Sequence, residues 1–349
     1  MKHKPQTLTT FTTLTALAFS ASAIVFGCLT PISVFAQQDA PPAADSPPKG
    51  SQLKKSDRKA SEVFDVIKTR LDGFDSFSCQ IYQTFLMTGH RLHAAGRYYH
   101  ASGNRFRLEY RIFPIRATKK ADKEHLQLDG EPEDTSKLKV TGSLTQVSDG
   151  SVLWSYWVNA DQKQLTRRNI GEIVEAADSA PNYSSAQSLS DLGVGGMQTL
   201  LTQIQTGMDF GQVQELQAKS GKMLVLTGRW NAKTLKDVFQ VPDDPNAQLP
   251  EFVPDYVRLF VSEKGMLPAK IQYLKKHPNP EVKQVQPLAT LDFRNVEFNG
   301  KIPDETFVFK RPDDQKITEV DLTSQVIEGI KNSGAADEQA KPAPESARQ

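Results

Sequence analysis

The chain has 349 residues, a formal net charge of +1 at pH 7 and two cysteines. Charges this evenly balanced argue against nucleic-acid binding and against electrostatic docking on anionic lipid. If Cys28 leaves with a leader, Cys79 stands alone and no internal disulfide can hold the fold.

Residues 1–36 are typical of a secretory signal peptide. Lys2 and Lys4 form a basic start, an apolar stretch follows, and small residues up to Ala36 precede a cleavage point. We therefore predict a periplasmic protein that begins at Gln37.

An alternative reading of the leader stays open. The segment "IVFGC" ending at Cys28 resembles the site at which bacterial lipoproteins are cut and acylated. Cleavage there would leave the protein anchored to a membrane by lipid on Cys28.

Two segments contain too few large apolar residues to bury a core. Residues 37–57 are rich in Pro, Ala, Ser and Gln and are predicted to be a disordered linker, and residues 326–349 a disordered tail. Between them we expect one monomeric domain, 58–325, interrupted by a charged insertion at about 117–139 that has no apolar periodicity.

The domain is expected to open with a helix and continue in strands. Residues 56–73 carry one apolar stripe, with Ser56 or Asp57 as possible caps. Strands are predicted at 77–85, 94–100 and 105–113, and the last alternates apolar and charged residues most regularly.

A tight hairpin turn is predicted at Asp149-Gly150, with positive φ at both residues. The following strand, 152–158, is unusual because both of its faces are apolar. A second helix is predicted at 195–208, behind the glycine-rich segment "GVGG", and it aligns Met197, Leu200, Leu201 and Ile204 on one face.

Further strands are predicted at 222–230, at 256–274 around a turn at Glu263-Lys264-Gly265, and at 289–300 and 306–312. Strands that follow one another without regular strand–helix alternation indicate an antiparallel sheet that helices close on one side. The expected fold class is mainly β, or α+β.

Several segments resemble the LolA/LolB-like lipoprotein-sorting family. They are "IKTRLDGFDSFSCQIYQTF", "GRYYHASGNRFRLEY", "QVSDGSVLWSYW" and "DETFVFKRPDD" followed by "ITEVD". The resemblance implies an incomplete antiparallel β-barrel, or strongly curved sheet, with helices as a lid over its open side. It also implies a hydrophobic cavity for acyl chains and a role in carrying lipoproteins through the periplasm.

The resemblance also supplies candidate site residues. The cavity candidates are Phe77, Ile81, Phe85, Tyr98, Phe106, Leu108, Tyr110, Trp154 and Tyr156, and the lid candidates are Met197, Leu200, Leu201 and Ile204. Carriers of the family hold the lid with an arginine before a proline in the turn after the second strand. Here Ser102 and Gly103 occupy that turn, and Arg105 lies at a different point.

No catalytic motif is present: the sequence has no nucleophile elbow, no phosphate-binding loop and no metalloprotease spacing. His90, His93 and His100 are expected at the surface without a metal, and Cys79 as a buried, inert thiol. We expect a non-enzymatic carrier of lipid or lipoprotein acyl chains that needs no cofactor and binds no nucleic acid. The alternative is an envelope sensor or interaction module that contacts membrane proteins.

Overall fold

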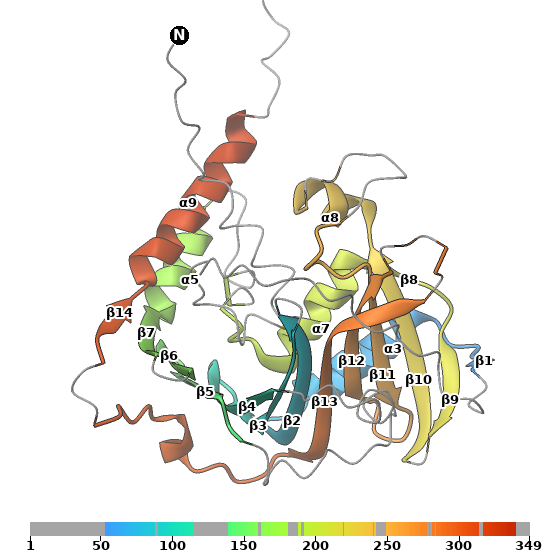
Figure 1. Cartoon of the computed structure of the whole chain (residues 1–349), viewed down its shortest axis with the longest axis horizontal. Helices are drawn as coiled ribbons and strands as arrows, with labels where there is room; N and C mark the ends of the chain where they lie inside the picture. The colour runs from blue at the N-terminus through green and yellow to red at the C-terminus, as the bar shows by residue number, and fades with distance from the viewer. Residues whose placement is uncertain are drawn as a thin grey trace, which may run out of the picture.

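The computed structural model describes residues 53–87, 90–114, 139–159, 162–180, 188–189, 192–218, 220–239, 241, 249–277, 279, 281–282, 284–313 and 317–339. In these ranges the chain forms a strongly curved sheet of 14 strands, with helix α7 inside the curve (Figure 1). The expected signal peptide and nearly all of the charged insertion lie outside the described residues.

The sheet is open, because its two end strands do not pair with each other. Across the sheet the order is β1 (Lys54–Lys55), β9 (Gln214–Ala218), β10 (Gly221–Trp230), β11 (Tyr256–Ser262), β12 (Leu267–Lys276), β13 (Val285–Phe298), β2 (Ser76–Met87), β3 (His90–Ala101), β4 (Arg105–Pro114), β5 (Gly142–Asp149), β6 (Val152–Asn159), β7 (Gln162–Asn169) and β14 (Glu319–Asp321), and β8 (Met208–Phe210) pairs with β10. Neighbours are antiparallel, except that β14 runs parallel to β7. The expected fold class, an incomplete antiparallel barrel, is confirmed.

Alternation along each strand decides which side chains face the hollow of the sheet. On β4, Phe106, Leu108 and Tyr110 are at most 2% exposed, whereas Arg111 on the opposite face is exposed. Paired residues of antiparallel strands share a face, so this assignment extends across the sheet. We call the face that holds Leu108 concave and the other face the back.

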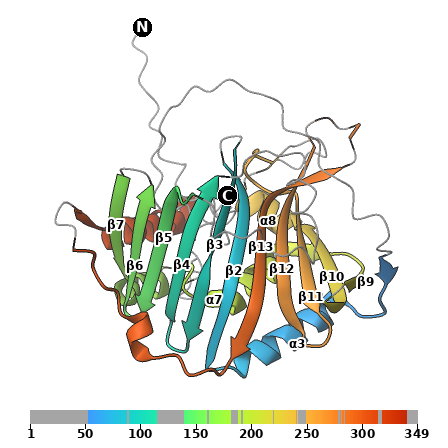
Figure 2. The same cartoon turned by 60° about the horizontal axis from the view of Figure 1, so that its bottom comes forward.

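Two helices cover the concave face, as the sequence predicted. Helix α3 (Ala60–Asp72) buries Val63, Phe64 and Ile67, and helix α7 (Gly196–Gly207) buries Leu201 and Ile204, all in the main core. Figure 2 looks at the back of the sheet, with α7 behind it. A short helix, α8 (Ala232–Asp237), follows β10.

The start of the described chain is more ordered than expected. Lys54 and Lys55 pair with β9, and the Ser56 hydroxyl donates to Glu215 at 3.1 Å. The predicted disordered linker 37–57 is therefore wrong at its end. The first helix begins at Ala60, after both of the expected caps, and its Glu62 accepts from the Lys59 N–H at 3.2 Å.

The predicted disordered tail is also wrong over residues 326–339, because helix α9 (Thr323–Gln339) occupies them. Ile330 joins a small core with Ile173 and Ala177 of helix α5 (Ile170–Asp178), which the sequence analysis missed. The apolar residues of the tail are few but lie on one helical face, and α5 covers them.

The hairpin between β5 and β6 forms at the expected place with a different turn. Gly150 has φ 100° and Asp149 does not have positive φ, so the two central residues are Gly150 and Ser151. The Asp149 carboxylate instead accepts from the N–H groups of Ser151 and Val152 at 2.7 and 2.8 Å.

The segment predicted as a strand at 306–312 is not one. It begins with a 3-10 turn, η2 (Asp304–Phe307), and continues along the back of the sheet; we call residues 304–313 the strap. Phe307 is 3% exposed, and the Phe309 ring stacks on Trp154 with centroids 5.1 Å apart. Apolar alternation predicted sheet pairing here, but the residues anchor by side chains instead.

Candidate functional site: a cavity beneath helix α7

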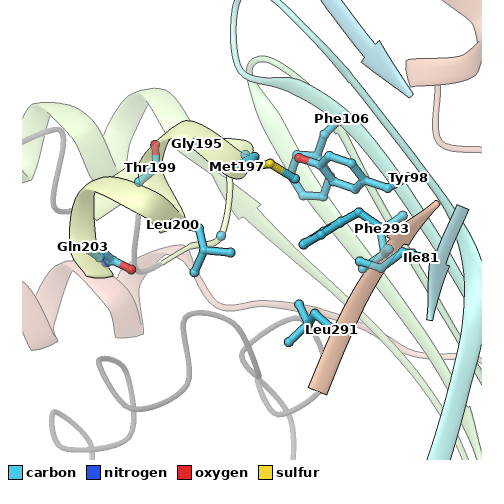
Figure 3. Close-up of a pocket in the computed structure, with 13 residues that line it drawn as sticks. Ile81, Tyr98, Phe106, Gly195, Met197, Thr199, Leu200, Gln203, Leu291 and Phe293 are labelled. Carbon is cyan, nitrogen blue, oxygen red and sulfur yellow. The ribbon is translucent and has the colours of Figure 1, made fainter. Parts of the chain in front are cut away.

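A cavity of about 50 Å³ lies between helix α7 and the concave face. Figure 3 shows Met197 and Leu200 of α7 facing Phe293 and Leu291 of β13 and Ile81 of β2. Among the described residues, the lining consists of Ile81, Tyr98, Phe106, Leu108, Gly193, Gly195, Gly196, Met197, Thr199, Leu200, Gln203, Leu291 and Phe293. A cavity needs roughly 10–15 Å³ to hold one water molecule, so this one has room for a few waters and none for an acyl chain.

The structure brings most of the candidate residues together. Ile81, Tyr98, Phe106 and Leu108 line the cavity from the sheet. Phe77, Phe85 and Tyr110 are buried on the same concave face without lining it. Of the lid candidates, Met197 and Leu200 line the cavity, whereas Leu201 and Ile204 are buried in the core beside it.

Trp154 and Tyr156 are not cavity residues, because they lie on the back of the sheet. Trp154 is paired with Val147, which is paired with Arg107, and Arg107 alternates with the concave residues of β4. Leu153 and Trp157 occupy the concave face of β6 instead. The aromatic residues of β6 are therefore covered on both faces: the core packs against the concave face, and the strap packs against the back.

Part of the lining was not predicted from the sequence. Leu291 and Phe293 alternate in the segment 289–300, which was predicted as a strand, but its facing could not be derived without the register that pairs Phe293 with Ile81. Gln203 was missed because it is polar, although it lies one turn after Leu200 on the same helix. Helical spacing from Leu200 could have identified it.

The C-terminal end of α7 is fixed to the sheet. The Asn231 side chain donates to the Thr206 carbonyl at 2.8 Å, and its backbone N–H donates to the Gly207 carbonyl at 3.1 Å. Trp230 packs against Gly207, and its indole N–H donates to the Pro254 carbonyl at 2.7 Å. Hydrogen bonds and a ring contact therefore hold this end.

The N-terminal end of α7 rests on glycines. Gly196 has φ 64°, and a Cβ there would lie 2.9 Å from His100 Cδ2 and 3.2 Å from the Tyr98 hydroxyl. Gly193 also has positive φ, at 71°, while Val194 between them is fully buried. Only glycine permits both the left-handed backbone and so close an approach to β3.

One hydrogen bond joins α7 to α3 near this end. The Gln198 amide donates to the Asp72 carboxylate at 2.5 Å, and both side chains are exposed to solvent. Arg105 takes no part in holding α7, because it lies on the back of the sheet, where it pairs with Asp304 at 2.9 Å and covers the Phe307 ring. The arginine lock described for the family is therefore not formed by Arg105.

Burial shifts the pKa values of three groups on the concave face in the direction that favours the neutral form. Burial raises the pKa of the Cys79 thiol to about 12, as expected for an inert cysteine. Burial lowers the pKa of His100, which is half-buried beside Tyr98 rather than at the surface as predicted. Burial is the main cause that raises the pKa of Tyr110, and the electrostatic effects of the neighbouring Cys79 and Tyr98 raise it further.

Solved structures that are similar to this chain include two from bacterial proteins. One is a domain assigned as a candidate outer membrane lipoprotein-sorting protein from Vibrio parahaemolyticus, with 9% identity, 70% of this chain and 94% of that chain covered, and a TM-score of 0.27. The other is a DUF1329 family protein from Desulfovibrio piger, with 10% identity, 71% and 96% covered, and a TM-score of 0.27. No protein-family model matches the chain, and no curated protein matches it.

The described ranges contain neither a candidate metal-ion cluster nor a helix suited to crossing a membrane. No cluster of three His, Cys, Asp or Glu residues is placed to hold a metal ion there. Among the helices of the same residues, none has the length and hydropathy to cross a membrane.

Proposed function

We propose that this protein binds acyl chains of lipids or lipoproteins between α7 and the concave face, and carries them through the periplasm without catalysing a reaction. The observation that supports this most is the cavity itself. Its walls are apolar residues of β2, β3, β4, β13 and α7, and its roof is a helix whose N-terminal end rests on glycines. A concave, mostly apolar site of this kind suits a hydrophobic ligand.

Binding requires α7 to move, because the closed cavity of about 50 Å³ is too small for a chain. The fixed C-terminal end of α7 makes the N-terminal end the part that lifts. An acyl chain would then replace the contacts of Met197 and Leu200 with contacts of its own. Each buried methylene contributes about 0.8 kcal/mol before the lost lid contacts are subtracted, so affinity should rise with chain length and then level off.

The proposed location rests on the leader. A signal peptide cleaved after Ala36 would deliver the protein to the periplasm, and acylation at Cys28 would anchor it to a membrane there. The resemblance of the short sequence blocks to the lipoprotein-sorting family supports a link to that process. An envelope sensor on the same scaffold is the alternative role.

Titration of fatty acids of graded length and of a triacylated lipopeptide tests the binding role. The variant Met197→Ser/Leu200→Ser removes apolar contact from the cavity roof and should weaken binding at least tenfold, while the sheet stays folded. Val66→Ser is the matched control, because Val66 lies on α3, is 40% exposed and does not line the cavity.

Negligible binding at every chain length, with the circular dichroism of a folded sheet, would contradict the carrier role. A membrane protein that co-purifies without lipid would then favour the interaction module. Equal weakening in the cavity variant and in Val66→Ser would mean that the ligand binds elsewhere.

A further inference from the structure

Three buried polar side chains near the cavity have no hydrogen-bond partner among the described residues. In Gln83 and Gln203 both the amide oxygen and the amide nitrogen are unpaired. In Tyr110 the hydroxyl is unpaired. Gln83 is 1% exposed and Tyr110 is 2% exposed. Each such group costs about 1–3 kcal/mol when nothing satisfies it.

Gln203 lines the cavity from the lid, and Gln83 is buried in the sheet beside residues that line it. Gln83 lies two residues after Ile81 on β2, so both side chains are on the concave face. Gln83 is paired with Leu291 on β13, and both Ile81 and Leu291 line the cavity. Gln203 lines the cavity from α7, next to Leu200 (Figure 3). The lid therefore presents an unpaired amide to the cavity, and the sheet holds a second one next to the lining residue Leu291.

Tyr110 adds a third group on the same wall. It belongs to the concave row of β4 and covers Gly96, where a Cβ would lie 3.1 Å from the ring. Its neighbour in the row, Leu108, lines the cavity, as does Tyr98. A hydroxyl without a partner here can donate to an acceptor that enters from the cavity.

The charge of the cavity restricts what could satisfy these groups. Among the described residues that line it, none is Lys, Arg, Asp or Glu. A carboxylate or phosphate buried there would find no opposite charge, which is strongly unfavourable. A neutral carbonyl accepts from amide and hydroxyl donors without this penalty.

We propose, on the basis of the binding role above, that the ligand is an acyl chain with a neutral ester or amide linkage. When α7 lifts, this linkage lies against Gln203, on the side of the opened cavity where Gln83 and Tyr110 adjoin the lining residues. The carbonyl oxygen accepts from the glutamine amides and from the Tyr110 hydroxyl. An amide linkage also supplies an N–H for the glutamine oxygens. The charged or polar head of the ligand then stays outside the lid.

The test compares three probes with the same chain length: a monoacylglycerol ester, the corresponding alkylglycerol ether, and the free fatty acid at a pH where it is ionised. The ester and ether differ in the carbonyl group. The wild-type protein should bind the ester about tenfold more tightly than the ether, and more tightly than the fatty acid.

The variant Gln83→Leu/Gln203→Leu should reduce the ratio of ester to ether affinity to about one while the ether still binds. Leucine replaces an unpaired buried amide with an apolar side chain, so folding should not suffer. Gln217→Leu on β9, where Gln217 is exposed, is the matched control and should keep the wild-type ratio.

Equal affinity for ester and ether in the wild-type protein would overturn the proposal and leave the general binding role intact. An unchanged ratio in the double variant would also overturn it, and would mean that water satisfies the glutamines. Fatty acid bound as tightly as the ester would contradict the requirement for a neutral linkage. Binding of none of the probes would instead contradict the proposed function.

Discussion

The two faces of the sheet are both aromatic, but they are covered in different ways. On the back, the strap is held by the Arg105–Asp304 ion pair at 2.9 Å, by the Arg107 guanidinium donating to the Thr306 carbonyl at 3.3 Å, and by the Phe309–Trp154 stack. On the concave face, hydrogen bonds hold the C-terminal end of α7, while the rest of the helix lies on apolar side chains and leaves polar atoms unpaired. The strap is held along its length, whereas α7 is the cover that we propose a ligand displaces.

This difference shows that aromatic content does not identify a binding surface. Both faces of β6 are apolar in sequence, yet its back serves to anchor the strap. What marks the concave face is the combination of a cavity, glycines at one end of the covering helix, and polar groups without partners. Substitutions in the strap and in α7 should therefore have different effects on stability and on ligand binding.

The largest effect is expected from the strap. Phe307→Ala removes a ring that is 3% exposed and should lower the free energy of unfolding by about 3 kcal/mol, because it leaves a void against the sheet. Denaturant titration measures this loss. Affinity for acyl chains should stay unchanged, since the strap does not contact the cavity; a parallel loss of affinity would show that the two faces are coupled.

A smaller effect on stability, with a larger one on the lid, is expected from Gly196→Ala. The left-handed backbone costs alanine about 1–2 kcal/mol, and the new Cβ would meet the His100 ring. Amide hydrogen exchange should accelerate in the first turn of α7. Gly103→Ala is the control, because Gly103 also has positive φ, at 76°, but has no atom within 4 Å of a Cβ. Equal exchange in both variants would argue against α7 lifting at this end.

The smallest effect is expected from pH. Because burial lowers the pKa of His100, the unfolded chain binds a proton more readily than the folded one, and stability should fall as pH drops through about 6.5. The groups against this ring are Tyr98, Gly196, and the paired residues Phe77 and Phe106, none of them charged. Melting temperatures at pH 7.5 and 5.5 measure the change, and His100→Gln should reduce it. An identical change in that variant would assign the effect to other groups.

The fold was predictable from the sequence where one face of an element is buried and the other is wet. Residues 105–113 and 195–208 have clear periods, and both elements form at the predicted places. Helix α5 was missed because it is short, with 9 residues, and α9 because its apolar residues are few; the two helices pack against each other in a small core of their own.

The site was predictable in part, for a related reason. Alternation identified Ile81, Tyr98, Phe106 and Leu108 as residues of one face. It could not decide which face of β6 is concave, because Leu153 and Trp154 are both apolar and the register with β5 is a long-range property. Gln83 and Gln203 were missed because a polar residue in an apolar row looks like an exception to the pattern.

The ends of the open sheet have a consequence for how the protein behaves in a crowded compartment. An unpaired strand edge is a template on which another chain can add a strand and start aggregation. Here β1 covers the edge of β9, and β14 covers β7, where Arg167 pairs with Asp321 at 2.8 Å. β1 falls in the predicted linker, and β14 falls within the predicted domain, close to its end. Short, charged flanking strands therefore cover part of each edge of the half-barrel, which reduces the length of edge on which another chain could add a strand.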